Sequence, residues 1–457
     1  MTEFLLDDLT EEALTGRSDA AEEPSWLRDR RLAAFKRYLD LAWPDSRADE
    51  FWRSTPFQRR IDVDRAVVTT APADVEVPAS VTDGLDLGSA TARIIDGEVV
   101  DITLPTAMAE LGVVVTDLAT AAREHGDLVR THLGSLTTSD PEGTGGGSDR
   151  TVTVNDAAWT AGLFVHVPAE VELDAPISVQ VHASTPGAHL PRVLGVLGHH
   201  ARATLYLEHT SAPELDALVD EVVEVIAQDA SKLDVVSLQR WDGPVQHLSL
   251  QKVAAHRDAS IRHLTVTIGG ATVRVLPECD LVGAGAEVRP LGIYFADEGQ
   301  WFDLQPYVRH LAPHASSDVL FKGALQGHSR TVFRGNIFVH KDAVGTVTDE
   351  NNRSLILTEG ARADATPFLE IECADITAGH GSATGQIDAL HLFYLESRGI
   401  RRDDALRLIV FGFFRDVLRE IAAPGIEDVA LADIEARVEA ADLSKVQIND
   451  AALQDLG

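Results

Sequence analysis

Short stretches of alternating apolar and polar residues fill the chain from residue 151 to residue 370. Clear examples are VHVPAEVEL, ATLYLEH, IRHLTVTI and NIFVH, and Gly, Asp, His and Pro separate them. A period of two residues is typical of a β-strand that buries one of its faces. The pattern therefore predicts a mainly β core for this part of the chain.

A longer period runs through the same region. An alanine in a turn-like setting recurs at intervals of 29, 29, 27, 29 and 28 residues, and a strand-like run follows most of these alanines. The alanines are Ala201, Ala230, Ala259, Ala286, Ala315 and Ala343. Periods of this length are typical of stacked coils, in which each coil buries its inner face only against its neighbours. Because strands fill each period, we predict a parallel β-helix, with a β-sandwich of evenly spaced turns as the alternative.

A helix is expected near the N-terminus, in the stretch EPSWLRDRRLAAFKRYLDLAWP. Leu32, Phe35 and Leu39 recur there at helical spacing. Ser25 is a suitable N-cap, and Pro44 follows where the helix should end.

Three more helical segments follow Gly385. QIDALHLFYLESRG closes with Gly399 at a C′ position, RDDALRLIVFGFFRDVLREIAAPG should stop at Pro424 and Gly425, and LADIEARVEAADL is amphipathic. The apolar face expected for the second segment consists of Leu408, Phe411, Phe414, Leu418 and Ile421.

These patterns divide the chain into three regions. An N-terminal helical or mixed region, residues 1–150, ends in a linker rich in Gly, Ser and Thr at residues 137–150. The β-helix core spans residues 151–383, and a C-terminal helical domain spans residues 384–457. Within the first region, residues 66–135 mix short apolar runs with one helix-like stretch and indicate no particular fold.

The composition narrows the classes of partner. The chain has 39 Lys and Arg against 72 Asp and Glu, a net charge of −33, which repels nucleic-acid phosphates and anionic lipids. We therefore expect no nucleic-acid partner and no membrane partner. Two cysteines far apart in sequence indicate a reducing compartment, and the acidic N-terminus has no secretory pattern, so a cytoplasmic location is expected.

Most motifs of catalysis and nucleotide binding are missing from the sequence. There is no phosphate-binding P-loop, no HExxH and no GxSxG, so we expect no nucleotide bound by this chain itself. His199 and His200 are expected in a turn. The stretch DEGQWFD groups three acids around Trp301, which would suit a β-helical polysaccharide lyase or hydrolase, and an acidic solvated loop is the alternative. The three acids are Asp297, Glu298 and Asp303.

The stretch ADITAGHGSATG places His380 between two glycines. Gly379 and Gly381 give the backbone freedom and leave the imidazole without bulky neighbours, so the ring could reach a partner surface. A neutral imidazole binds iron and can replace a thiolate at iron-sulfur centres. The alternative is a structural turn. Cys373 is expected to be a packed, shielded thiol.

Residues 352–414, from NRSLIL through ARADATPFLEI, HG, ATGQID and LFYLESRGI to FGFF, resemble the C-terminal signature of the SufB/SufD family of iron-sulfur cluster assembly proteins. RTVFRGNIFVHKDA and FVHVPAEVELDAPISV resemble the family core, and EPSWLRDRRLAAF with EFWRSTP resembles its N-terminal region. The resemblance implies a right-handed parallel β-helix core, flanked by an N-terminal helical or α+β region and a C-terminal helical domain.

The resemblance also separates the two paralogues. A SufB-type chain is expected to carry a cluster-building cysteine where this chain has Ala378, whereas His380 is retained. The usual Asp pair before this site is reduced to Ala374 and Asp375, and the usual Lys is Thr377. The resemblance implies that His380 faces a SufB cysteine across a heterodimer interface.

The implied partners are a SufB-like paralogue and a SufC-like ABC-type ATPase, and the chain could form a homodimer in isolation. An iron-sulfur cluster would be held transiently at the paralogue interface, and reduced flavin is a possible ligand of the whole complex. Residues expected to bind the ATPase are Leu392, Phe393, Tyr394, Ser397, Arg398 and Gly399. Their alternative role is to pack the helix against the β-helix. We expect a non-enzymatic SufD-like subunit, with a SufB-type primary scaffold and a polysaccharide lyase or hydrolase as the other readings.

Overall fold

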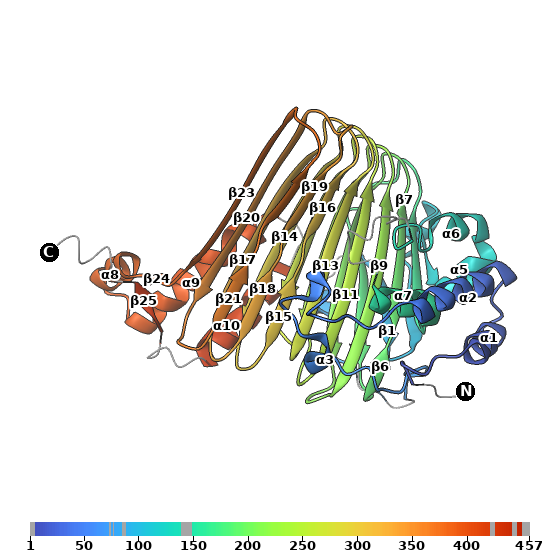
Figure 1. Ribbon diagram of the computed structural model, residues 1–457, viewed down its shortest axis with the longest axis horizontal. Coiled ribbons are helices and arrows are strands. Elements are labelled where there is room, and N and C mark those ends of the chain that lie inside the picture. The colour runs from blue at the N-terminus through green and yellow to red at the C-terminus, as the bar shows by residue number, and fades with distance from the viewer. Residues whose placement is uncertain are drawn as a thin grey trace.

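Two large parallel sheets face each other through most of the computed structural model (Figure 1). The structure describes residues 5–72, 75, 77–84, 88–138, 149–420, 426–440 and 446–449. The chain passes from one sheet to the other and back, so each coil adds a strand to both sheets. This arrangement is a β-solenoid, as the period of the sequence predicted.

The first sheet, sheet I, has ten strands. In spatial order they are β2 (Glu98–Thr103), β1 (Ala90–Ile95), β5 (Ile177–Ala183), β8 (Arg202–Ser211), β10 (Lys232–Arg240), β12 (Ser260–Thr267), β14 (Glu287–Ala296), β17 (Ser316–Leu325), β20 (Thr346–Ile356) and β23 (Ile376–Gly385). All neighbours are parallel except β1 and β2, which pair antiparallel at one end of the stack.

The second sheet, sheet II, has thirteen strands. Its main path is β3 (Val114–Asp117), β4 (Ala161–Val167), β7 (Pro191–Leu197), β9 (Ala217–Ala227), β11 (Gln246–Ala255), β13 (Thr272–Leu281), β15 (Trp301–Leu304), β18 (Arg330–Phe333) and β21 (Arg362–Ala365). Beside it lie β6 (Gly187–His189), β16 (Tyr307–His310), β19 (Asn336–Val339) and β22 (Phe368–Ile371). Only β3 and β4 pair antiparallel within the described strands of this sheet.

The strand register confirms the predicted period and adjusts its phase. It aligns successive coils at intervals of 30, 28, 27, 29 and 31 residues. The aligned residues are Arg202, Lys232, Ser260, Glu287, Ser316 and Val347. Ser231, not Ala230, therefore shares the buried position of Ala201, and Ala230 forms the preceding turn with φ of +57°. His200 takes the same left-handed conformation one coil earlier, which confirms the turn predicted there.

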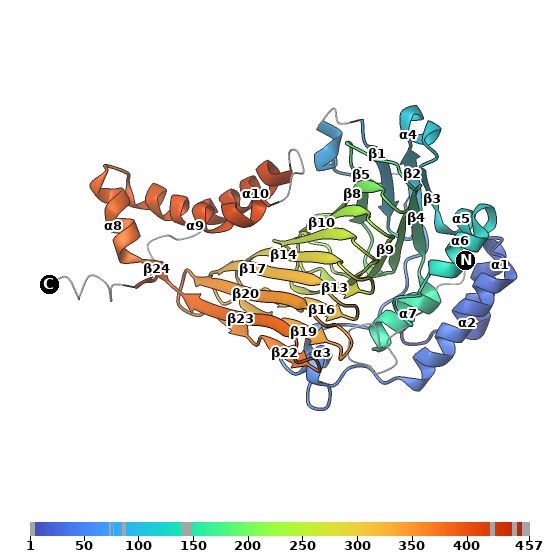
Figure 2. The same cartoon turned by 90° about the horizontal axis from the view of Figure 1, so that it is seen from above.

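Helices cover the outer face of each sheet (Figure 2). On sheet II lie α1 (Glu11–Ala20), α2 (Ser25–Asp40), α5 (Leu118–Glu124), α6 (Gly126–His132) and α7 (Arg150–Ala158). On sheet I lie α9 (Arg402–Leu418) and α10 (Ile426–Ala440), joined to the solenoid through β24 (Ile387–Asp388), which pairs with β25 (Ile448–Asn449), and α8 (Ala389–Ser397). The short helices are η1 (Glu50–Trp52), α3 (Phe57–Arg60), η2 (Val81–Gly84) and α4 (Thr106–Glu110). A separate apolar core fills the space between the two sheets.

Glycines and aromatic rings alternate between two neighbouring coils in this inner core. Gly292 lies opposite Phe321 and Gly323 lies opposite Tyr294. A Cβ atom on Gly323 would come within 1.7 Å of the Tyr294 ring, and one on Gly292 within 2.1 Å of the Phe321 ring. Each ring therefore occupies the space that the opposite glycine leaves free.

Several local expectations change in the structure. Residues 66–135 extend sheet I with β1 and β2 and close sheet II with β3. Pro24 is the N-cap of α2, so the expectation for Ser25 was wrong. Gly399 follows the C-cap of α8 with φ of +84°, as expected. Ile421, Pro424, Gly425 and most of the 137–150 linker lie outside the described residues.

The apolar face of α9 is rotated from the expected one. Leu406, Val410 and Phe414 are buried against sheet I, together with Val417 and Leu418. Leu408 is exposed and Phe411 is only partly buried. The buried face of α9 is the apolar stripe whose residues are spaced by four and three positions. The sequence of this helix is also compatible with a second, overlapping apolar stripe.

Candidate functional site

His380 lies in the middle of β23, the last strand of sheet I, and not in a turn. The turn interpretation was therefore wrong. β23 pairs with β20 along one side, and no described strand pairs with its other side. We call this end of the solenoid, formed by β21, β22 and β23, the open end.

The register fixes which face of β23 carries His380. Val319, Glu350 and His380 lie opposite one another on three successive strands. Residues in register on parallel strands point to the same face, and Val319 is part of the inner core. His380 therefore lies on the interior face of the last coil, and its side chain is exposed because no described coil covers it.

The glycines beside His380 make room for side chains from the coil below. A Cβ atom on Gly379 would lie 2.7 Å from Asp349 Oδ1, and one on Gly381 would lie 3.0 Å from Asn351 Oδ1. Asn351 Nδ2 donates to Asp349 Oδ2 at 2.5 Å, so these two side chains are held together next to the two glycines. Neither glycine has a positive φ, so their role here is steric, not conformational.

Glu350 is a residue of this site that the sequence analysis missed. Its side chain is buried directly below His380 in register, and neither carboxylate oxygen has a hydrogen-bond partner among the described residues. Burial raises the pKa of Glu350 to about 8, and the charge of Asp349 adds to the rise. The signal was available in the sequence, because the two residues are separated by one period of the solenoid.

The open end also presents apolar side chains and unpaired backbone groups. Phe368 and Ile371 on β22 are exposed. Unpaired strand edges with apolar neighbours favour association with another sheet edge. The arrangement can therefore dock a second β-structured chain and bring that chain next to His380.

The six residues expected to bind an ATPase divide into buried and exposed sets. Leu392 is 2% exposed and belongs to the core between α9 and sheet I, so it packs the helix as in the alternative reading. Phe393 and Tyr394 are 61% and 57% exposed. The Arg398 guanidinium lies 5.2 Å from the centre of the Tyr394 ring.

The other two members of this set shape the end of α8. Ser397 Oγ donates to the backbone oxygen of Tyr394 at 2.7 Å, and Gly399 ends the helix. The exposed Leu408 of α9 adds a third large apolar side chain to this part of the C-terminal domain.

The structure does not assemble a sugar-cleaving site around Trp301. Asp303 is buried and accepts from Arg274 Nη1 at 2.5 Å, while Glu298 is exposed in a turn. Trp301 is buried, donates to Thr55 Oγ1 at 3.0 Å and lies between two guanidinium groups. These groups hold the N-terminal segment on sheet II, and the three acids do not converge.

Both cysteines are buried. Cys279 lies in the inner core, where burial raises the pKa of its thiol well above the ordinary value. Cys373 packs in a small cluster with Ile337, Val339 and Ala343, as the sequence indicated. Cys373 lies between β22 and β23 at the open end, but its side chain is buried.

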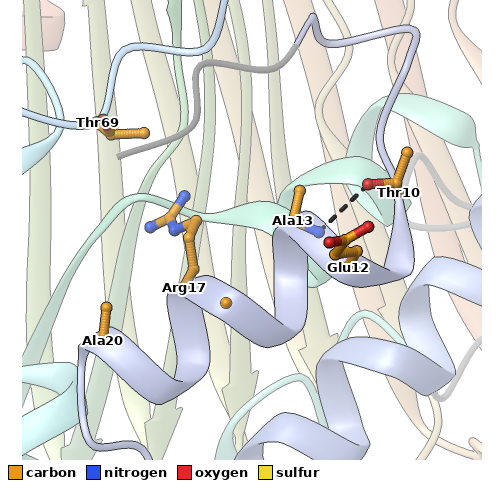
Figure 3. Close-up of a pocket in the computed structure, with 7 residues that line it drawn as sticks. Thr10, Glu12, Ala13, Arg17, Ala20 and Thr69 are labelled. Carbon is orange, nitrogen blue, oxygen red and sulfur yellow. Dashed lines mark hydrogen bonds between the residues drawn. The ribbon is translucent and has the colours of Figure 1, made fainter.

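Figure 3 shows a hollow on the protein surface beside α1, where the polar lining residues hold the helix in place. Thr10 caps the helix by accepting from the Ala13 amide at 3.2 Å. Arg17 crosses the hollow and donates to the backbone oxygens of residues 158, 159 and 160. The guanidinium group is therefore used to hold α1 against the end of α7.

Among the described residues, no helix is both long and apolar enough to span a lipid bilayer.

Comparison with known proteins gives consistent matches along the chain. Residues 180–413 match the family model described as the SUF system FeS cluster assembly SufBD core domain, and residues 17–179 match that of the SufBD protein N-terminal region. An iron-sulfur cluster assembly SufBD family protein of Mycobacterium leprae is 37% identical over 297 residues, which cover 63% of this chain and 75% of that protein. A protein of the same description from Staphylococcus epidermidis is 26% identical over 432 residues, or 90% of each chain.

Proposed function

Because the chain belongs to the SufBD family of iron-sulfur cluster assembly proteins, we propose that it is a SufD-like subunit that pairs with a SufB-like paralogue. The observation that carries this proposal is His380 on the interior face of β23, an edge strand that pairs with a described strand on one side only. An imidazole in this position can meet a ligand from a second solenoid only when the two open ends come together. This chain thus contributes one part of the proposed ligand set, and the partner contributes the rest.

Ala378 favours the SufD-like role over that of a primary scaffold. It lies two residues before His380 on the same face of β23, so a cysteine there would add a soft thiolate to this edge. With alanine at that position, this chain offers one imidazole and the partner must supply the thiolate. A nascent iron-sulfur cluster is the cargo that such a mixed ligand set would hold.

The C-terminal helices supply the surface for a SufC-like ATPase in this proposal. Phe393 and Tyr394 stand exposed on α8, while Leu392 anchors the same helix to the solenoid. A docked ATPase could therefore move α8 and transmit that movement to sheet I through α9.

The test is co-expression of the full chain with its SufB-like and SufC-like partners, as wild type, His380→Ala or His328→Ala. His328 is a matched control because its ring is also exposed but lies in the turn between β17 and β18, outside β23. The purified complexes are compared for subunit ratio, iron and acid-labile sulfide. We expect all three to assemble, and His380→Ala alone to lose most of its iron and sulfide.

Equal cluster content in the His380→Ala and His328→Ala complexes would remove His380 from cluster building. Failure of the wild-type chain to form the complex would refute the proposed partnership itself. Assembly of a cluster on the isolated wild-type chain at full stoichiometry would instead favour a SufB-type primary scaffold.

A further inference from the structure

A second group of possible metal ligands lies inside the solenoid, among coils well before the open end. It consists of His209 on β8, Glu221 on β9 and His247 on β11. One ligand atom from each residue lies within 4.8 Å of the other two. All three side chains are fully buried in the space between sheet I and sheet II.

The contacts within the group are asymmetric. His209 Nε2 lies 2.8 Å from Glu221 Oε1, and Ser249 Oγ donates to Glu221 Oε2 at 2.8 Å. His247 Nε2 is 3.8 Å from the same Oε2, beyond hydrogen-bond distance. Two hydrogen bonds, with His209 and Ser249, therefore hold the Glu221 carboxylate, whereas no hydrogen bond joins it to His247.

His247 is the unexplained member of the group. Neither of its ring nitrogens has a hydrogen-bond partner among the described residues, although the side chain is fully buried. His209 Nδ1 also lacks a partner. A buried polar group without a partner costs free energy, which a coordinated cation would recover.

The charge of the Glu221 carboxylate also favours a bound cation. In the part of the chain that the structure describes, no Lys or Arg pairs with Glu221, so the interior holds a carboxylate that needs a cation.

We propose that His209, Glu221 and His247 bind one divalent first-row transition-metal ion, such as Zn²⁺ or Fe²⁺, as a resident structural ion. Two imidazoles and a carboxylate are a common protein donor set for such ions. Because His209 comes from sheet I and the other two ligands come from sheet II, the ion joins the two sheets across the core. The proposal does not depend on the role of His380.

Trp241 provides a route of entry. Its ring centre lies 5.6 Å from that of His209 and 5.2 Å from that of His247. The same residue lines a surface cleft with Asp242, Asp433 and other polar residues, between the ends of three strands of sheet I and α10. A movement of this one side chain would connect the buried ligands with the carboxylates of the cleft.

The proposal is tested by metal analysis of the full chain. The chain is produced with added Zn²⁺, treated with a weak chelator to strip surface ions, desalted and analysed for metal per chain. The variants are His247→Gln and, as a matched control, His310→Gln, which is equally buried in the interior but pairs with Ser317. We expect one tightly held ion in the wild type and in His310→Gln, and at least a tenfold loss in His247→Gln.

The same measurement on His380→Ala separates this site from the proposed cluster site, because the structural ion should remain in that variant. A second readout covers the case in which His247→Gln does not fold. The wild-type chain, stripped under partly denaturing conditions and refolded with Co²⁺, should show visible absorption from imidazole coordination and a higher melting temperature than the metal-free protein. A wild type without bound metal, or equal metal in His247→Gln and His310→Gln, would overturn the proposal, as would refolding with Co²⁺ that leaves both absorption and melting temperature unchanged.

Discussion

His380 and Glu350 occupy the same face of neighbouring coils but have opposite surroundings. The imidazole is exposed at an edge with free space around it, whereas the carboxyl group is buried without a hydrogen-bond partner among the described residues. Gly335 permits the burial, because a Cβ atom there would come within 1.8 Å of Glu350 Oε1. An acid that stays protonated at neutral pH therefore lies directly under the proposed ligand, ready to release its proton if a cation arrives.

Replacing Glu350 with glutamine should stabilise the protein at neutral and higher pH. Burial raises the pKa of Glu350 to about 8, and Asp349 adds to the rise, so the unfolded chain releases this proton at a lower pH than the native protein does. Between the two pKa values, the native state therefore loses stability as the pH rises, by up to about 1.4 kcal/mol per pH unit. Glu350→Gln should remove this decline.

The measurement is the free energy of unfolding in denaturant at several pH values between the ordinary carboxyl pKa and mildly alkaline pH. Glu298→Gln is the control, because Glu298 is exposed. If the wild type and Glu350→Gln lose stability in parallel as the pH rises, Glu350 does not titrate as its surroundings indicate.

At the scale of elements, the solenoid depends on the fit between adjacent coils. β14 and β17 place a ring against a glycine twice, in opposite directions, at Gly292 with Phe321 and at Tyr294 with Gly323. A helix on the protein surface packs through one apolar face only, so residues on its other faces need not fit against a neighbour. α9 accordingly tolerates Gly412, at which an added Cβ atom would meet nothing within 4 Å.

Gly323→Ala and Gly412→Ala should change stability in opposite directions. The Cβ atom at residue 323 would lie 1.7 Å from the Tyr294 ring, and overpacking of this kind costs about 1–3 kcal/mol. Alanine at residue 412 should gain up to about 1 kcal/mol, because glycine is a poor helix former. Thermal and denaturant unfolding of the two variants checks this, and similar shifts in both would contradict the packing described for β14 and β17.

The sequence was informative where physical rules are local or periodic. The recurring alanines predicted the stacked coils, and Gly399 correctly marked the end of α8. Leu408 and Ser25 misled because two helical stripes overlap in one case and a neighbouring proline takes the cap in the other. A turn was the alternative for His380 because glycines usually signal one, and only the side chains of Asp349 and Asn351 on the coil below explain those glycines.

At the scale of the whole molecule, the two ends of the solenoid differ. One end carries the antiparallel terminal strands β2 and β3, with helices nearby (Figure 2). The other end exposes β23 and the apolar side chains of Phe368 and Ile371. Continuation of the parallel coils by a partner is thus expected at the open end.

Ile371→Asp should weaken association with the proposed SufB-like paralogue, because Ile371 is exposed on β22 at the open end. A carboxylate among the apolar side chains of the open end must lose its hydration on docking, and a tenfold rise in Kd corresponds to about 1.4 kcal/mol. Val100→Asp is the matched control, since Val100 is similarly exposed on β2 at the opposite end. Equal affinity of the two variants in a titration would place the interface elsewhere.

The unequal ends also limit how far such chains can assemble. A solenoid with free edges at both ends could add units without limit and grow into a filament, as unprotected edges do. Here the antiparallel strands β2 and β3 interrupt the parallel stacking on one side, so a further coil cannot continue the same pattern there. Joining two open ends consumes both, so the product is a finite pair, and the net charge of −33 on each copy further discourages stacking of identical chains.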